Sequence, residues 1–139
     1  MLQCADGLPE TRDQGENQMM RGSTTIFTVT NVMESLAYYR DKIGFDVAFE
    51  YGKPTFYVGL CSGEVTLHLI SAGQTPRQPG HGAVSIFVDD VDAVHAGLIR
   101  RGAKVLKEPK DQDYGLRDFD VVDLDGNMIF FGMESKKAS

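Results

Sequence analysis

Residues 114–132 read YGLRDFDVVDLDGNMIFFG, and this stretch predicts two β-strands joined by a tight turn. Phe119 and Val121 alternate with Asp118 and Asp120, which is the period of a strand with one apolar and one charged face. We therefore expect this strand to cover a hydrophobic core with one face and to present carboxylates on the other.

The second strand of this hairpin begins after a turn pair. Asp125-Gly126 favours the positive φ angles of a type I′ turn, and an unbroken apolar run at residues 128–131 follows it. The sequence therefore predicts a two-residue type I′ hairpin.

Length and composition restrict the class of protein. The chain has 139 residues, 42% of them hydrophobic, which suffices for one domain with a core. We find no apolar run long enough to span a bilayer and no signal peptide. The net charge of −6 argues against nucleic acid as a partner and allows a cationic ligand. We expect a cytoplasmic protein without membrane or nucleic-acid partners.

The chain has two cysteines, Cys4 and Cys61, in very different contexts. We interpret both as free thiols in a reducing cytoplasm, with a structural disulfide as the alternative.

The remaining segments predict strands, helices and a linker in a repeating order. We expect a flexible leader at residues 1–23, in which Met19 or Met20 can serve as a start, and a frayed tail at residues 135–139. Strands are predicted at residues 24–30, 45–51, 56–61, 65–71, 83–88 and 104–107, before the opening hairpin. Helices are predicted after Asn31 up to Gly44, and after Asp89-Asp90 up to Gly102. A linker of glycine and proline, residues 72–82, separates two halves.

The two halves align with each other, which is the strongest feature of the sequence. FTVTNVMESLAYYRDKIGFDV matches IFVDDVDAVHAGLIRRGAKV at an offset of 59 residues until a gap of one residue. We therefore predict an α+β domain at residues 24–134, built from two βαβββ modules at residues 24–71 and 83–134. Their curved mixed sheets should enclose a cleft, with the helices on the outer face.

Several short motifs resemble the vicinal oxygen chelate superfamily, which includes glyoxalase I, extradiol dioxygenases, and fosfomycin- and bleomycin-resistance proteins. The motifs are VTNV (29–32), YRDKIGF (39–45), VTLHL (65–69), YGLRDF (114–119) and DLDGN (123–127). They are most similar to the bleomycin-resistance group, which usually has Trp at the position of Tyr114 and Pro at the position of Leu124. Relatives commonly pair their modules across two chains, so the resemblance also implies a homodimer with two clefts.

The resemblance implies a test for a metal. Enzymes of this superfamily hold a divalent metal with four inward-facing residues, whose positions in register are Thr24, His68, Ala83 and Phe130 here. Only His68 is an ordinary ligand, and a single imidazole does not hold a catalytic metal. A shifted set that adds His81 is the alternative. His95 lies on an apolar helix face and is interpreted as a partly buried helix residue.

Strand parity and the loop before the last hairpin predict an aromatic and apolar cleft with a few carboxylates. The expected lining is Thr66, His68, Ile70, Tyr57, Phe87, Tyr114, Arg117, Asp118, Asp120, Met128 and Phe130. Such a lining suits a flat, partly cationic small molecule. A purely structural role is the alternative for four of these residues. Asp118 and Asp120 can form a solvated strand face, and His68 can be held by the Thr66 hydroxyl. Arg117 can pair with a nearby carboxylate, and for this residue we favour the pairing.

Three functions remain open at this point. The first is a metal-free protein that sequesters a hydrophobic or cationic compound, such as an antibiotic, and needs no catalytic residue or cofactor. The second is a glyoxalase-type lyase or dioxygenase that uses Zn, Ni, Mn or Fe with His68 as one ligand. The third is an interaction module with a vestigial cleft.

Overall fold

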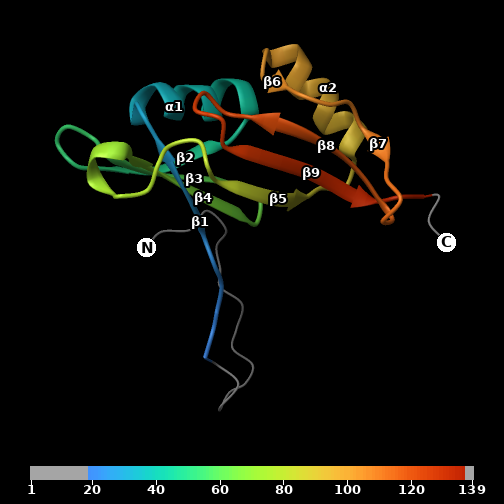
Figure 1. The fold of residues 1–139 in the computed structure, drawn as a ribbon, viewed down its shortest axis with the longest axis horizontal. Coiled ribbons are helices and arrows are strands. Elements are labelled where there is room, and N and C mark those ends of the chain that lie inside the picture. The colour runs from blue at the N-terminus through green and yellow to red at the C-terminus, as the bar shows by residue number, and fades with distance from the viewer. Residues whose placement is uncertain (1–18, 137–139) are drawn as a thin grey trace.

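The computed structural model describes residues 19–136 and arranges them as two modules of similar build (Figure 1). Residues 1–18 of the predicted leader and residues 137–139 of the predicted tail lie outside the described part. The first module consists of β1 (Thr25–Val29), α1 (Val32–Tyr38), η2 (Tyr39–Ile43), β2 (Asp46–Tyr51), β3 (Tyr57–Ser62) and β4 (Val65–Ser71). A short 3₁₀ helix, η3 (Ala72–Gln74), begins the linker. The second module consists of β5 (Ala83–Phe87), α2 (Val91–Arg101), β6 (Lys104–Val105), β7 (Lys110–Asp111), β8 (Leu116–Val122) and β9 (Met128–Glu134).

Each module contains one mixed sheet. The strand order is β1-β4-β3-β2 in the first sheet and β5-β9-β8-β6 in the second, with β7 added beside β8. β1 runs parallel to β4, and β5 runs parallel to β9, whereas the other pairs are antiparallel. Both helices cover the same side of the sheets (Figure 1). The predicted α+β fold of two modules with mixed sheets and outer helices is confirmed.

The core lies between the sheets and the helices, as strand alternation predicts. Leu67 and Leu69 of β4, Phe119 and Val121 of β8, and Ile129 of β9 are each at most 1% exposed. Their neighbours along each strand point to the opposite side, which we call the inner face. Side-chain parity therefore separates the core residues from the candidate site residues.

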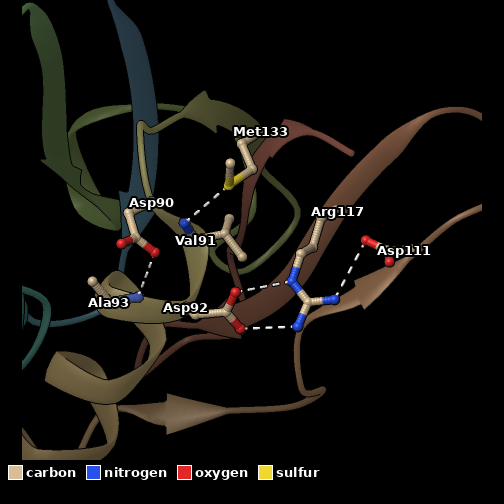
Figure 2. Close-up of polar contacts among 7 residues, drawn as sticks. All are labelled: Asp90, Val91, Asp92, Ala93, Asp111, Arg117 and Met133. Atoms are coloured by element: carbon tan, nitrogen blue, oxygen red, sulfur yellow. Dashed lines mark hydrogen bonds and ion pairs between the residues drawn. The ribbon is translucent and has the colours of Figure 1, made fainter. Parts of the chain in front are cut away.

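Both predicted helix starts have the expected caps. The Asn31 side chain accepts a hydrogen bond from Glu34 N at 3.0 Å, and the Asp90 carboxylate accepts one from Ala93 N at 3.1 Å. Figure 2 shows the second cap. Both predicted glycine ends are also present, since Gly102 follows α2 with a φ of 86°.

The first helix contains one residue more than the second, and its last part is a π-helix. Twelve positions separate Val32 from Gly44, whereas eleven separate Val91 from Gly102. The extra residue is accommodated where α1 changes into η2, Tyr39–Ile43. This insertion accounts for the single-residue gap in the alignment of the two halves.

The predicted type I′ turn is wrong. β8 and β9 are separated by five residues, 123–127, and no residue other than glycine has a positive φ among residues 19–136. A type I′ turn requires positive φ at both central residues, and here only Gly126 has it, with φ of 106°. The Asp123 carboxylate instead organises the turn, because its Oδ1 accepts the backbone N–H groups of Asp125, Gly126 and Asn127, each at 2.9 Å.

The same loop, residues 123–127, joins the two modules, and we call it the latch loop. The Tyr39 hydroxyl donates a hydrogen bond of 2.8 Å to Asp123 Oδ2, and Asn127 Nδ2 donates to Thr28 O at 3.1 Å. Thr30 donates its hydroxyl to Asp125 Oδ1 at 2.7 Å. Burial and the adjacent Asp123 charge raise the pKa of Tyr39 well above its usual value, so its hydroxyl remains a donor.

Three further details differ from the sequence-based expectations or add to them. The strand predicted at 104–107 covers only Lys104–Val105, and the following loop contains the short strand β7. Cys61 is disulfide-bonded, which corrects the interpretation of a free thiol there; Cys4 lies outside the described residues.

Within residues 19–136, no helix is long and apolar enough to cross a bilayer.

The latch loop generates a stability prediction. Replacing Asp123, which is 1% exposed, by Asn places an NH₂ group against buried donors and leaves at least one of them unpaired. We expect Asp123→Asn to lower the free energy of unfolding by roughly 3 kcal/mol in urea denaturation. The exposed carboxylate variant Asp113→Asn is the matched control and should change it by less than about 0.5 kcal/mol. Equal stability of the two variants would show that the latch contributes nothing.

Candidate ligand-binding site on the inner face

The inner face of the second module contains a hollow of about 480 Å³, which we call the module-two hollow. It lies where β8 and β9 meet the loop that contains β7. Its lining is Lys107, Glu108, Lys110, Gln112, Tyr114, Asp118, Phe119, Asp120 and Phe130. Its volume is within the range of small-molecule pockets.

Two side chains hold the Asp118 carboxylate at the rim of this hollow. Gln112 Nε2 donates to Asp118 Oδ1 at 3.0 Å, and the Tyr114 hydroxyl donates to Asp118 Oδ2 at 2.8 Å. The hydrogen bond to Asp118 raises the pKa of Tyr114, so the phenol stays protonated at neutral pH. The Tyr114 ring remains 66% exposed and is available to stack on a bound group.

The second carboxylate, Asp120, lies deeper. It is 9% exposed, and its only ion pair among the described residues is with Lys107 Nζ at 3.4 Å. The Lys107 side chain is 71% exposed, so water screens this pair and its attraction is weak. Asp120 is therefore not part of a solvated strand face, and it is a buried negative charge that a cationic ligand could neutralise.

Phe130 supplies the apolar floor of the hollow. It lies opposite Asp120 in the β8–β9 register and is half-buried. An aromatic ring beside two carboxylates provides both stacking surface and charge for a flat cation. The hollow thus joins Tyr114, Asp118, Asp120 and Phe130 of the predicted cleft residues.

The inner face of the first module holds an aromatic cluster around His68. His68 is 3% exposed, and its Nδ1 lies 2.8 Å from the Tyr57 hydroxyl. The Phe49 ring meets His68 edge-on at 5.3 Å and stacks on Tyr57 at 6.2 Å. Burial lowers the pKa of His68, so the imidazole is neutral at pH 7.

Phe49 was not among the predicted cleft residues, and the hydroxyl beside His68 is that of Tyr57 rather than that of Thr66, which was one of the two alternatives. Thr66 hydrogen-bonds with Thr24 at 3.0 Å instead of holding the imidazole. Phe49 lies over Gly59, where a Cβ atom would collide with its ring. Gly59 inside a predicted strand was the available signal, since glycine in a strand marks close approach of another group.

The other predicted cleft residues do not share the module-two hollow. Thr66, His68, Ile70 and Tyr57 lie on β3 and β4 of the first module, and Met128 lies at the start of β9. Phe87 is 70% exposed at the end of β5. None of these side chains lines the module-two hollow, so the structure does not bring all the predicted cleft residues together in one site.

Arg117 was predicted to line the cleft, but its side chain lies on the other side of the sheet. Its neighbours Asp118 and Leu116 point to the inner face, so its guanidinium lies on the helix side of β8. There it forms a bidentate pair with Asp92 of α2 at 2.9 and 3.0 Å and reaches Asp111 at 3.4 Å (Figure 2). The structure therefore agrees with the favoured interpretation, in which Arg117 pairs with a carboxylate. This ion pair joins α2 to the sheet.

The residues at the four metal-ligand positions that the family implies do not fit a metal site. Among the family-implied positions, Thr24 contacts Thr66, Ala83 and Phe130 carry no donor atom, and His68 is engaged by Tyr57. Within residues 19–136 no group of three His, Cys, Asp or Glu side chains is placed to hold an ion. His95 packs edge-on against Phe119 at 5.0 Å, in agreement with a helix residue that is partly buried.

Comparison with known proteins tests the resemblance. The sequence model of the Glyoxalase/Bleomycin resistance protein/Dioxygenase superfamily matches residues 22–131. None of the curated protein sequences compared with the chain matches it significantly.

Solved structures of this superfamily share the fold. The bleomycin-binding protein of Streptomyces verticillus, solved with copper(II)-bleomycin, has a TM-score of 0.68 and 22% identity over 82% of this chain and 96% of that one. An antibiotic-binding protein from a Streptomyces species has a TM-score of 0.67 and 26% identity over 82% and 97% of the chains. A glyoxalase/bleomycin resistance protein from Catenulispora acidiphila has a TM-score of 0.67 and 25% identity over 81% and 97%. Together with the fold and the matched motifs, these findings show that the chain belongs to the Glyoxalase/Bleomycin resistance protein/Dioxygenase superfamily.

Proposed function

We propose that this protein binds and sequesters a small, partly apolar cation in the module-two hollow, without a metal cofactor and without chemical conversion. The buried carboxylate of Asp120, whose ion-pair partner among residues 19–136 is the exposed Lys107, is the observation that carries this proposal. A bound cation would neutralise it, while Tyr114 and Phe130 would cover the ligand's apolar surface.

Two structural neighbours support the choice of a binding function over an enzymatic one. The Streptomyces verticillus protein is a bleomycin-binding protein, and the Streptomyces neighbour is an antibiotic-binding protein. Binding needs affinity but no reacting group, and the carboxylate, ammonium, amide and phenol groups of the hollow can supply the polar contacts for it.

We also propose that the protein is a homodimer in which a second copy completes each cleft. Ile26 of β1 is 52% exposed and Phe87 of β5 is 70% exposed, and both lie on the inner face. Contiguous exposed apolar surface marks a face that another chain covers, and in the proposed dimer these two side chains belong to such a face. Size-exclusion chromatography with light scattering should give twice the chain mass, and a monomer at all concentrations would contradict this proposal.

A glyoxalase-type lyase or dioxygenase is the alternative, and metal content decides between the two. We expect protein purified without a chelator or affinity tag to contain far less than one equivalent of Zn, Ni, Mn or Fe by mass spectrometry. Adding these ions should not shift the thermal unfolding midpoint. About one equivalent per chain, lost on His68→Ala, would overturn the metal-free proposal and establish His68 as a ligand.

The hollow predicts a matched pair of binding variants. With metal-free bleomycin as the cationic probe, Asp118→Asn and Asp120→Asn should each weaken binding about 10-fold in calorimetric titration, because each removes a charge that attracts the cation. Arg117→Gln changes a neighbouring charge on the opposite face of β8, and it should leave the affinity within about 2-fold.

Each outcome of this titration bears on the proposal. A loss of affinity in the two aspartate variants, with a gain of similar size in Arg117→Gln, would show that net charge, rather than the hollow, sets the affinity. Absence of binding by the wild-type protein to bleomycin and to other aromatic cations would overturn the proposed function.

His68 generates a prediction about pH. Because burial lowers its pKa, the unfolded chain takes up this proton at a higher pH than the folded chain does. The stability gained from neutral His68 is complete above the usual histidine pKa of about 6.5. It is lost as the pH falls towards the lowered pKa of the folded state. Between about pH 7.5 and pH 5.5, the wild type should lose more unfolding free energy than His68→Gln in urea denaturation. Identical losses would show that His68 is not buried as a neutral imidazole.

A further inference from the structure

The two modules meet at two junctions, and only one of them is closed. The latch loop between β8 and β9 closes the junction with the end of β1. At the other junction, the shorter turn between β3 and β4 faces the end of β5 and α2. A groove of about 720 Å³ lies there, and we call it the inter-module groove. It is separate from the module-two hollow and shares no side chain with it.

The two junctions differ at one aligned position of the two helices. Tyr38 fills the closed junction, where its hydroxyl donates to Val122 O at 2.7 Å and accepts from Lys104 N at 2.9 Å. At the offset of 59 residues, Tyr38 corresponds to Gly97 of α2, which lines the groove. The open junction therefore lacks the aromatic ring and hydroxyl that the closed junction has.

The two junctions also differ in the polar residues of their turns. Asp125 of the latch loop accepts hydrogen bonds from both the backbone N–H and the hydroxyl of Thr30. The aligned residues at the groove are Ser62 and Asp89, and no hydrogen bond joins them in the described part of the chain. The groove is thus left without the polar contacts that hold the closed junction together.

Two arginines bring positive charge to the groove. The point where a Cβ of Gly97 would lie is 3.0 Å from Arg101 Nη1 and 3.5 Å from Arg100 Nη2. Arg101 is oriented by its hydrogen bonds to Lys42 O at 3.1 Å and Ile43 O at 2.9 Å. Neither guanidinium pairs with a carboxylate within residues 19–136. Two adjacent cations without a counter-ion favour an anionic group beside Gly97.

The rest of the groove limits what kind of anion fits. Ile86 and Phe131 in its wall are 7% and 6% exposed, so the deep part is apolar. Asp89 and Glu64 line it as well, and their charges disfavour a second negative group on the ligand. An apolar body with a single negative charge satisfies both constraints.

We propose that the inter-module groove binds a small aromatic monocarboxylate. The ring packs against the apolar wall formed by Ile86 and Phe131, and the carboxylate pairs with Arg100 and Arg101, whose guanidinium groups lie over Gly97. This site is additional to the cation-binding function proposed for the module-two hollow, and neither site depends on the other.

The test uses 3-(4-hydroxyphenyl)propionate as the probe and its neutral amide as the control ligand. Calorimetric titration of the full chain should show that the acid binds at least about 10-fold more tightly than the amide. In ¹⁵N-resolved NMR spectra, the acid should shift the backbone amides of Gly97, Gly44 and Gly63, which line the groove. Equal affinity for acid and amide would overturn the proposal.

Variants at two positions separate the site from general effects. Gly97→Phe should abolish binding, since its ring displaces the two guanidinium groups from their place over residue 97 and enters the groove. The helix can accept this substitution because only the ends of arginine side chains approach the new Cβ. Arg100→Gln should weaken binding about 10-fold, whereas Arg77→Gln, an exposed arginine outside the groove, should change it less than 2-fold. Circular dichroism confirms that each variant is folded.

Two other outcomes would also reject the proposal. Undiminished binding by folded Gly97→Phe would place the probe elsewhere. If Gly97→Phe instead converts a dimer to a monomer, the groove is an interface between two copies and not a ligand site. Titration with metal-free bleomycin in the same variants tests the module-two hollow independently, so the failure of one proposal is distinguishable from the failure of the other.

Discussion

The buried carboxylate of Asp123 is the interaction on which the two-module arrangement depends. It accepts five hydrogen bonds, three from the backbone of its own loop and two from the side chains of Tyr39 and Asn127. A carboxylate that is 1% exposed is tolerated only when donors satisfy its oxygens, so the loop and the first module must come together around it. The same residue therefore shapes the last hairpin and sets the position of one module against the other.

The duplication gives the protein two similar modules, but small differences between them create its candidate sites. The second module has Asp118 and Asp120 on its inner face, whereas the first has an aromatic cluster around His68. At the junctions, a tyrosine on one helix corresponds to a glycine on the other, and one junction is filled while the other is hollow. An approximately symmetric scaffold thus becomes chemically asymmetric through a few side chains.

Much of the fold could be predicted because its signals are local and periodic. Alternation along β8 identified the buried faces of Phe119 and Val121, and the caps at Asn31 and Asp90 marked both helix starts. The turn at 125–126 was mispredicted because the Asp123 side chain, rather than the preferences of the two central residues, decides its backbone. In the candidate site, strand parity located Asp118, Asp120 and Phe130, but it could not indicate that Phe49 covers Gly59 from a neighbouring strand.

The sequence by itself determined the duplication, the order of the elements, the family and the faces of the strands, because hydrophobic period, caps and motifs are properties of neighbouring residues. Only the tertiary structure decided which side chains meet. It assigned Arg117 to Asp92 across the sheet–helix layer and His68 to Tyr57 across two strands. It also separated the module-two hollow from the inter-module groove. These outcomes depend on distances between segments far apart in the chain, and no local pattern encodes such distances.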